Sequence, residues 1–172
     1  MKMTRLILAI IILSSADDGL KNGVIDRVRS DMAALLDCEW SITGNAARKY
    51  NCIAWSVGED SAWYVATAGA KLHPTDISID DVWGDGDGMM TITELDAFYA
   101  AKGYLPTGTD AKDADVMFYS GFHGARKKNC RCQTILQPVF ESKCGEGPMI
   151  EHLCSQLNGM TYGTPIRFYK HK

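Results

Sequence analysis

The sequence predicts an α+β domain in which N-terminal helices pack on a small antiparallel sheet. In the first half of the chain, apolar residues recur at the three- and four-residue spacing of amphipathic helices. In the second half, short β-prone runs alternate with glycine, lysine, asparagine and proline. Helices followed by strands are typical of domains with an antiparallel sheet. Because no internal repeat or linker divides the chain, we expect residues 17–172 to form a single domain.

Residues 1–16 have the pattern of a secretory signal peptide. Lys2 and Arg5 precede an unbroken apolar run over residues 6–13, and residues 14–16 are small enough for cleavage. This run is shorter than the roughly 20 residues that cross a bilayer. We therefore expect cleavage after residue 16 and a secreted or periplasmic protein without a stable membrane anchor, whose formal charge changes from −3 to −5. A buried first strand or helix is the alternative interpretation.

The composition narrows the classes of partner. With 46% hydrophobic and 23% charged residues, the chain has the composition of a folded globule. Its formal charge of −3 argues against nucleic acid as a partner, because nucleic acids bind basic surfaces. We expect no cofactor, and the sequence leaves the oligomeric state open.

Three segments carry helical signals. Residues 23–36 place their apolar side chains on one stripe, namely Val24, Ile25, Val28, Met32, Leu35 and Leu36. Residues 50–57 are expected to form one or two helical turns, with Asn51 as the N-cap and Gly58 as the stop. Residues 93–102 resume the helical spacing and end before a glycine.

The remaining segments are predicted as strands and loops. Residues 61–67 are aromatic and β-prone, whereas residues 71–88 are rich in proline, aspartate and glycine and should be mostly loop. Short strands are expected at residues 116–119, 122–126, 132–136, 139–142 and 166–169. We interpret the MIEHL run around His152 as the first turn of a late helix.

Residues 83–94 have the spacing of an EF-hand calcium loop if Gly88 takes the sixth position. The oxygen ligands would then be Asp85, Asp87, Thr91 and Glu94. However, Trp83 occupies the first position, where a carboxylate is required, and we expect no helix to enter the loop. Thr91 and Glu94 also have the spacing of a capping box for the following helix. We favour a helix-entry loop, and a calcium-binding interaction domain is the alternative.

The six cysteines are open to several interpretations, and they are Cys38, Cys52, Cys130, Cys132, Cys144 and Cys154. In an exported protein an even number favours three disulfides. A nucleophilic Cys52 would leave at least one other cysteine unpaired. Cys130 and Cys132 are too close for a zinc knuckle, so we expect no structural zinc.

Cys52 is the strongest candidate for a nucleophile. It follows the Asn51 cap and would lie at the N-terminus of a helix, where the pKa of a thiol is lowered. Among the histidines, His123 lies in a β-like run that opens the sheet region. A nucleophile on an early helix and a base on a following strand form the papain-type arrangement. The alternative is a packing cysteine and an ordinary strand histidine.

A series of motifs supports this interpretation. Between residues 50 and 170 the chain reads, in order, YNCIAWSVG, VWG, TELDAFYAAKGY, HGAR, ESKCG, MIEH and YGTPIRFYK. These motifs resemble an uncharacterised bacterial domain family with the pattern NCIAW, YW, HAAR, SKLG, IEH and YG-RF. The order of cysteine, histidine and a following strand is also similar to papain-like (NlpC/P60-type) cysteine hydrolases.

The resemblance implies roles for individual residues. Cys52 would be the nucleophile and His123 the general base, and a third residue within 139–144 would orient the imidazole. Ser142 aligns with the serine of the family's SKLG motif, and Glu141 is its chemical rival because a carboxylate holds an imidazolium better.

The comparison with the family pattern has implications at two further positions. Cys144 replaces a leucine of the family, and a disulfide between Cys144 and Cys154 would suit an exported member. Trp83 matches a tryptophan of the family and would then anchor the core.

We therefore expect an exported cysteine hydrolase that cleaves an amide or peptide bond, with cell-wall peptides as the first substrate class to test. The Cys52 thiolate would attack the carbonyl, and His123 would pass the thiol proton to the leaving amine. The backbone amide of Cys52 and the side chain of Asn51 would form an oxyanion hole. A non-catalytic binding or structural module on the same fold is the alternative.

A local basic run follows His123 and consists of Arg126, Lys127, Lys128 and Arg131. We interpret it as a solvated hairpin tip. Binding of an anionic substrate is the alternative, because a charge run alone is weak support for a site.

Overall fold

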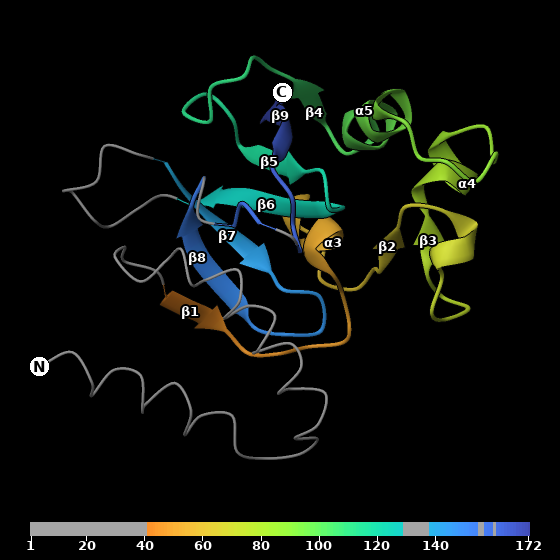
Figure 1. The fold of residues 1–172 in the computed structure, drawn as a ribbon, viewed down its shortest axis with the longest axis horizontal. Coiled ribbons are helices and arrows are strands. Elements are labelled where there is room, and N and C mark those ends of the chain that lie inside the picture. The colour runs from red at the N-terminus through yellow and green to blue at the C-terminus, as the bar shows by residue number, and fades with distance from the viewer. Residues whose placement is uncertain (1–40, 129–137, 155–156, 160) are drawn as a thin grey trace, which may run out of the picture.

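The computed structural model describes residues 41–128, 138–154, 157–159 and 161–172 (Figure 1). These residues form a mixed domain of a seven-stranded antiparallel sheet and a few short helices, as the sequence predicts. The expected signal peptide, the helix at 23–36 and the strand at 132–136 lie outside the described residues. None of the helices in the described ranges has the length and apolarity needed to cross a membrane.

The sheet has the strand order β1-β8-β7-β6-β5-β9-β4, and every neighbouring pair is antiparallel. Its strands are β1 (Ser41–Gly44), β4 (Tyr104–Pro106), β5 (Val116–Tyr119), β6 (His123–Lys128), β7 (Val139–Lys143), β8 (Met149–Leu153) and β9 (Pro165–His171). A separate parallel pair joins β2 (Tyr64–Val65) to β3 (Ile77–Ser78). The helices are α3 (Cys52–Ser56), the 3-10 helix η2 (Ala68–Ala70), α4 (Ile79–Trp83) and α5 (Ile92–Ala101).

One predicted segment is wrong, and another contains more regular structure than expected. The run around His152 is strand β8 and not a helix, because β7 and β1 pair with it from both sides. Residues 71–88 are mostly loop, as expected, but they also contain β3 and α4, which together span residues 77–83. Ser78 is the N-cap of helix α4, and its hydroxyl accepts a hydrogen bond from the backbone N–H of Asp81 at 3.2 Å. The helix buries Ile79.

Helices α3 and α5 begin at the predicted caps. Asn51 Oδ1 accepts the backbone N–H of Ala54 at 3.2 Å, and α3 ends before Gly58. At the start of α5, Thr91 and Glu94 form the complete predicted capping box. These caps satisfy backbone N–H groups that would otherwise lack partners, and they fix where each helix starts.

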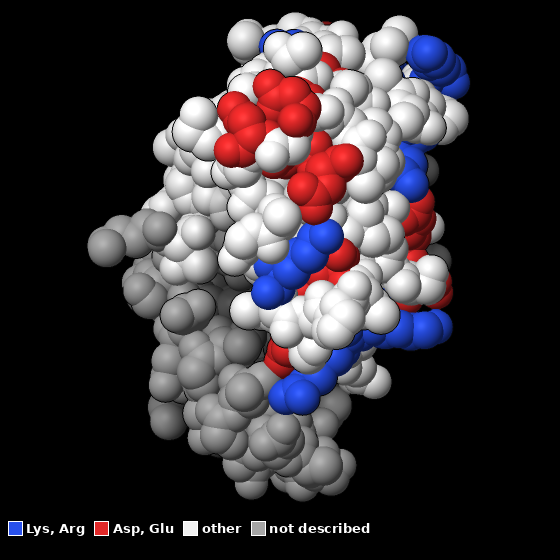
Figure 2. All heavy atoms as spheres, turned by 90° about the vertical axis from the view of Figure 1, so that its right-hand side faces the viewer, with Lys and Arg blue, Asp and Glu red and all other residues white. Residues whose placement is uncertain are grey.

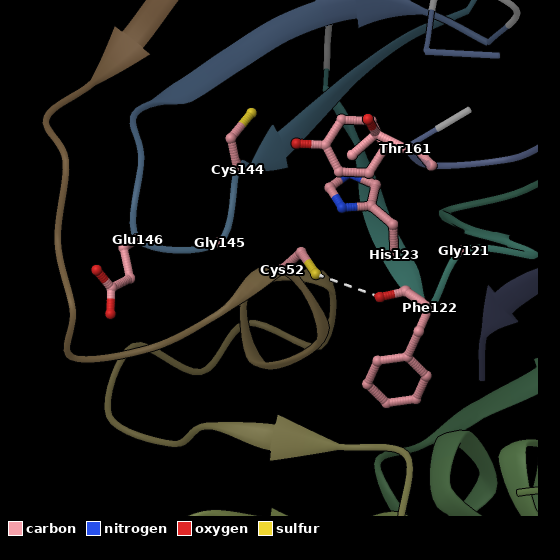
Figure 3. Close-up of a pocket in the computed structure, with 9 residues that line it drawn as sticks. Cys52, Gly121, Phe122, His123, Cys144, Gly145, Glu146 and Thr161 are labelled. Carbon is pink, nitrogen blue, oxygen red and sulfur yellow. Dashed lines mark hydrogen bonds between the residues drawn. The ribbon is translucent and has the colours of Figure 1, made fainter. Parts of the chain in front are cut away.

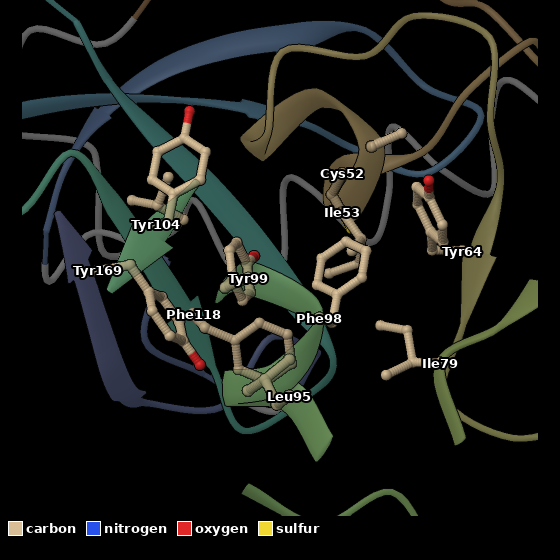
Figure 4. Close-up of a cluster of buried hydrophobic side chains, with 12 residues drawn as sticks. Cys52, Ile53, Tyr64, Ile79, Leu95, Phe98, Tyr99, Tyr104, Phe118 and Tyr169 are labelled. Atoms are coloured by element: carbon tan, nitrogen blue, oxygen red, sulfur yellow. The ribbon is translucent and has the colours of Figure 1, made fainter. Parts of the chain in front are cut away.

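The two faces of the sheet carry different cores because side chains alternate along each strand. Val116 and Phe118 of β5 pack with α3 and α5 in an aromatic cluster that includes Phe98 and Tyr99 (Figure 4). Tyr99 of α5 stacks on Tyr169 of β9 with ring centroids 4.0 Å apart. The opposite face buries a second cluster that includes Met117, Tyr119, Ala125, Phe140 and Ile150. Residues that are partners across two strands therefore share one of these faces.

Gly124 of β6 determines how closely α3 approaches the sheet. A Cβ atom at this position would lie 2.9 Å from both Cβ and Oγ of Ser56 and 3.2 Å from the backbone oxygen of Cys52. These distances leave no room for a side chain, so α3 rests directly on the backbone of β6. The contact places the first residue of α3 beside the first residues of β6.

We predict that Gly124→Ala destabilises the domain, because the added methyl group pushes α3 away from β6. The free energy of unfolding should fall by about 1–3 kcal/mol, as for other overpacked core sites. Urea unfolding followed by circular dichroism measures the change. Gly108→Ala is the matched control, because a Cβ at Gly108 meets no atom within 4 Å. Equal stability of the two variants would contradict the close contact.

Candidate functional site

A pocket of about 320 Å³ opens where α3, the start of β6 and the β7–β8 turn meet (Figure 3). Its lining residues are Cys52, Gly121, Phe122, His123, Cys144, Gly145, Glu146, Thr161 and Tyr162. The structure thus brings the two principal sequence candidates, Cys52 and His123, into one pocket.

Cys52 presents a free and largely buried thiol to this pocket, with 7% of the residue exposed. Its Sγ donates to the backbone oxygen of Phe122 at 3.8 Å (Figure 3). Burial raises the pKa of Cys52, although the backbone N–H groups of Gly124, Ile53 and Cys52 itself act in the opposite direction. The resting thiol is therefore protonated at neutral pH.

Phe122 has a strained backbone beside this thiol. Its φ of 55° lies in the left-handed region, which residues with a Cβ rarely adopt. The conformation occurs in the tight connection between β5 and β6. Such strain is often found at functional sites, where the surrounding structure enforces it.

His123 is the first residue of β6 and is almost completely buried, with 1% exposed. Its ring lies 4.1 Å from the Tyr162 ring and 5.6 Å from the Tyr119 ring, centroid to centroid. Within the described part of the chain, its Nε2 is buried and has no hydrogen-bond partner. Burial lowers the pKa of His123 to about 3, with a smaller contribution from His152. The imidazole is therefore neutral.

Cys52 and His123 reach the pocket from opposite faces of the sheet. His123 pairs with Tyr119 across the β5–β6 hairpin, so its ring belongs to the Tyr119 face. Cys52 belongs to the aromatic cluster of the other face. No hydrogen bond in the described ranges joins the two side chains. Both line the same pocket at the start of β6.

Ser142 was expected to orient His123, but its hydroxyl is bonded to another histidine. Ser142 Oγ lies 2.7 Å from Nε2 of His152, whose Nδ1 lies 2.8 Å from the Leu153 carbonyl oxygen. A carbonyl can only accept, so Nδ1 carries the proton and the Ser142 hydroxyl donates to Nε2. Burial lowers the pKa of His152 to about 4, which is consistent with this neutral tautomer.

Glu141, the rival of Ser142, also bonds elsewhere. Its Oε1 accepts from Lys128 Nζ at 2.9 Å. Glu141 pairs with Arg126 across the sheet, and the Arg126 guanidinium lies 4.2 Å from the Trp55 ring centroid of α3. Glu141 therefore lies on the α3 face, whereas His123 lies on the other. Arg126 and Lys128, expected at a hairpin tip, belong to β6.

The Asn51 side chain holds α3 in place through its hydrogen bonds. Besides capping Ala54, its Oδ1 accepts the backbone N–H of Tyr64 at 3.3 Å, and its Nδ2 donates to the Tyr64 carbonyl. This amide is therefore not directed at an oxyanion in this conformation. The backbone N–H of Cys52, the other expected donor, does face the thiol.

The expected disulfide between Cys144 and Cys154 is wrong. Cys154 is a free thiol whose Sγ donates to Met117 Sδ at 3.2 Å. Cys144 instead lines the pocket beside Cys52. Across the described ranges the structure contains no disulfide.

Lys143 is the residue of this region that the sequence interpretation missed. It lies in the ESKCG motif at the end of β7, and 0% of it is exposed. Burial lowers the pKa of its ammonium to about 8. The motif itself was the only signal, because a lysine at the end of a strand usually points into solvent.

The acidic loop before α5 lies apart from this pocket. Asp80, Asp85 and Asp87 bring carboxylate oxygens within 4.8 Å of one another. Acidic side chains gather on one part of the face shown in Figure 2. Asp80 is buried and accepts the backbone N–H groups of Gly86 at 3.2 Å and Gly88 at 2.9 Å. These hydrogen bonds account for the loop conformation. The expectation that no helix enters the loop is wrong, because α4 precedes it.

The other residues of the calcium alternative have structural roles. The Thr91 hydroxyl and the Glu94 carboxylate form the capping box, and Glu94 also accepts the backbone N–H of Asp85 at 3.3 Å. Trp83 packs edge-on against Phe98 with ring centroids 4.9 Å apart, so it anchors the aromatic cluster.

We predict that the domain loses stability as the pH falls below about 6.5, the ordinary pKa of histidine. The pKa values of His123 and His152 are lowered to about 3 and about 4 in the folded state. The unfolded chain therefore binds more protons between these values and pH 6.5. The free energy of unfolding should fall by up to about 1.4 kcal/mol per pH unit for each imidazole.

Urea unfolding from about pH 7 to about pH 5 measures this slope, in a window above the titration of most carboxylates. The variant His152→Gln should show a shallower slope than the wild type. His73→Gln removes an exposed histidine and serves as the control. A wild-type stability that does not change over this window would contradict the prediction.

The chain was compared with known protein families, curated proteins and solved structures. Neither the curated proteins nor the solved structures contain a significant match to the chain. The family model of a domain of unknown function, DUF7689, matches residues 41–170 and thus includes α3, the pocket and all of the sheet except the last residue of β9. This match confirms the resemblance to an uncharacterised domain family. The chain belongs to the DUF7689 family.

Proposed function

We propose that this domain is a cysteine hydrolase that cleaves an amide or peptide bond, with Cys52 as the nucleophile and His123 as the general base. One observation supports the proposal above all. A free thiol and a buried imidazole whose Nε2 lacks a hydrogen-bond partner among the described residues line the same pocket. An unpaired buried nitrogen is costly, and such groups are retained where they have a chemical role.

The proposed reaction starts from a neutral thiol and a neutral imidazole. His123 takes the thiol proton as the sulfur of Cys52 attacks the carbonyl carbon of the substrate. The resulting oxyanion is stabilised by backbone N–H groups at the start of α3. The imidazolium then protonates the leaving amine, and a thioester remains on Cys52. Water activated by His123 hydrolyses the thioester, releases the carboxylic acid and restores the thiol.

The arrangement supports a papain-like fold as part of this proposal. A short helix that begins with the cysteine packs on an antiparallel sheet, and the histidine begins a central strand of that sheet. His123 is held by the rings of Tyr119 and Tyr162. The Ser142 hydroxyl supports His123 only indirectly, through His152, whose ring also lies beside Tyr119.

Cell-wall peptides are the substrate class we propose first. A pocket of about 320 Å³ is at the lower end of the range for small ligands and can hold one amide with a neighbouring side chain. The signal-peptide pattern of residues 1–16 would bring the domain into the compartment that contains such peptides.

A non-catalytic binding module is the alternative, and the burial of Cys52 favours it. Only 7% of Cys52 is exposed and its pKa is raised, as for a cysteine that merely packs. Reactivity of the native thiol separates this alternative from the hydrolase.

We predict that Cys52 reacts with iodoacetamide faster than Cys154 in the native protein, although Cys154 is the more exposed thiol. The reason is that His123 can accept the proton of Cys52, whereas Cys154 donates to a thioether. Mass spectrometry after proteolysis gives the rate at each site. In His123→Ala the rate at Cys52 should fall about tenfold or more, as on loss of a general base. Modification of Cys52 only after denaturation would establish the binding module instead.

We further predict that the wild-type domain releases peptides from purified cell walls and that Cys52→Ala does not. The wild type should generate one new amine and one new carboxylate for each bond cleaved, and mass spectrometry of the soluble fraction detects both. Circular dichroism of the variant verifies that it is folded. Equal release by the two proteins would exclude Cys52 as the nucleophile.

A further inference from the structure

Lys143 lies beneath α3, on the same face of the sheet as Cys52. On the neighbouring strand Arg126 pairs with Glu141, and Arg126 packs on Trp55 of α3. Lys143 follows Glu141 by two residues on β7, so it shares the α3 face. A lysine that is completely buried at such a position requires an explanation, because this residue type is almost never fully buried unless paired.

Within the described part of the chain, the Lys143 ammonium contacts uncharged groups. Its Nζ donates to the backbone oxygens of Gly145 and Gly147, the latter at 2.7 Å, and lies 5.5 Å from the centroid of the Tyr50 ring. Among the ion pairs of the described ranges, none includes Lys143. The carbonyls orient the ammonium but do not neutralise its charge.

Titratable groups face Lys143 from three neighbouring parts of the chain. Cys52 lies on α3, Cys144 and Glu146 on the β7–β8 turn, and Tyr50 on the segment before α3. The Glu146 carboxylate is 3.2 Å from Arg48, and the Tyr50 hydroxyl donates to a methionine sulfur. The coupling between Lys143 and Cys52 is reciprocal, since each group favours the charged form of the other.

We propose that Lys143 is a positioning residue whose ammonium serves as the counter-charge of the Cys52 thiolate. This inference rests on the proposed function, because the proposed reaction is what requires Cys52 to ionise. When His123 removes the thiol proton, a negative charge forms in a buried site, where charges are stable only if they are paired. Lys143 supplies the opposite charge without transferring a proton, and the carbonyls of Gly145 and Gly147 keep it in place.

A purely structural role for Lys143 makes a different prediction. In that case the lysine only ties the β7–β8 turn together through Gly145 and Gly147, and the ionisation of Cys52 does not depend on its charge. Stability would then change when Lys143 is replaced, but the pH dependence of the thiol would not.

The first test compares the pH–rate profile of iodoacetamide reaction at Cys52 in the wild type and in Lys143→Met. Without the ammonium, the reaction should be about tenfold slower at neutral pH, and the profile should shift to higher pH. Lys143→Arg is the matched control, because arginine keeps a positive charge at the same position. The control should retain the wild-type pH dependence. An unchanged profile in a folded Lys143→Met would overturn the inference.

The second test leaves Lys143 in place. The protein is labelled with ¹³C at lysine Cε, and the titration of Lys143 is followed by NMR in the wild type and in Cys52→Ala. Removal of the ionisable thiol should move the high-pH part of the Lys143 titration to lower pH, because a thiolate that forms there keeps the ammonium protonated. An identical titration in the two proteins would overturn the inference even if Lys143→Met does not fold.

The two tests separate this inference from the proposed function. If Cys52 reacts rapidly and its rate depends on His123 but not on Lys143, the proposed hydrolase stands and the role of Lys143 is excluded. If the pH–rate profile of Cys52 shifts in Lys143→Met but the wild type releases no peptide from cell walls, the thiolate–ammonium pair stands and the proposed substrate class is excluded.

Discussion

The direct contact between α3 and the backbone of β6 at Gly124 is the constraint on which the site depends. Because no side chain separates the two elements, the first residue of α3 lies within reach of the first residues of β6. The same contact turns the backbone N–H of Gly124 toward the Cys52 thiol. A wider spacing between helix and sheet would separate the thiol from the pocket and from the ammonium of Lys143 beneath it.

Two separate systems of side chains support this contact from the two faces of the sheet. On one face, Asn51 joins the start of α3 to β2, and the aromatic cluster fills the space between α3, α5 and the sheet. On the other face, Ser142 and His152 form a buried pair beside Tyr119, which in turn contacts His123. Cys52 and His123 are therefore held by different cores, and both reach the pocket at the start of β6.

Local signals in the sequence were sufficient to predict α3, α5 and strands β5, β6, β7 and β9. Asn51 and the Thr91–Glu94 capping box mark helix starts through contacts within a few residues, and the family resemblance is confirmed. Strand β8 could not be predicted, because its conformation depends on two partner strands that are distant in sequence. The bond from Ser142 to His152 and the burial of Lys143 also depend on such pairing, so neither has a local signature.

The hydrogen bond from Cys52 to the carbonyl of Phe122 has a consequence for the chemical durability of the protein. Oxidation to sulfenic acid and disulfide exchange both proceed through the thiolate. A thiol that is buried and donates to a carbonyl is held in its protonated form, so these reactions require a group that can take the proton. When the proton leaves, the same carbonyl oxygen faces a negative sulfur and disfavours the ion. The Phe122 carbonyl thus favours the protonated form of Cys52, and oxidation of this cysteine should depend on His123 in the same way as its alkylation.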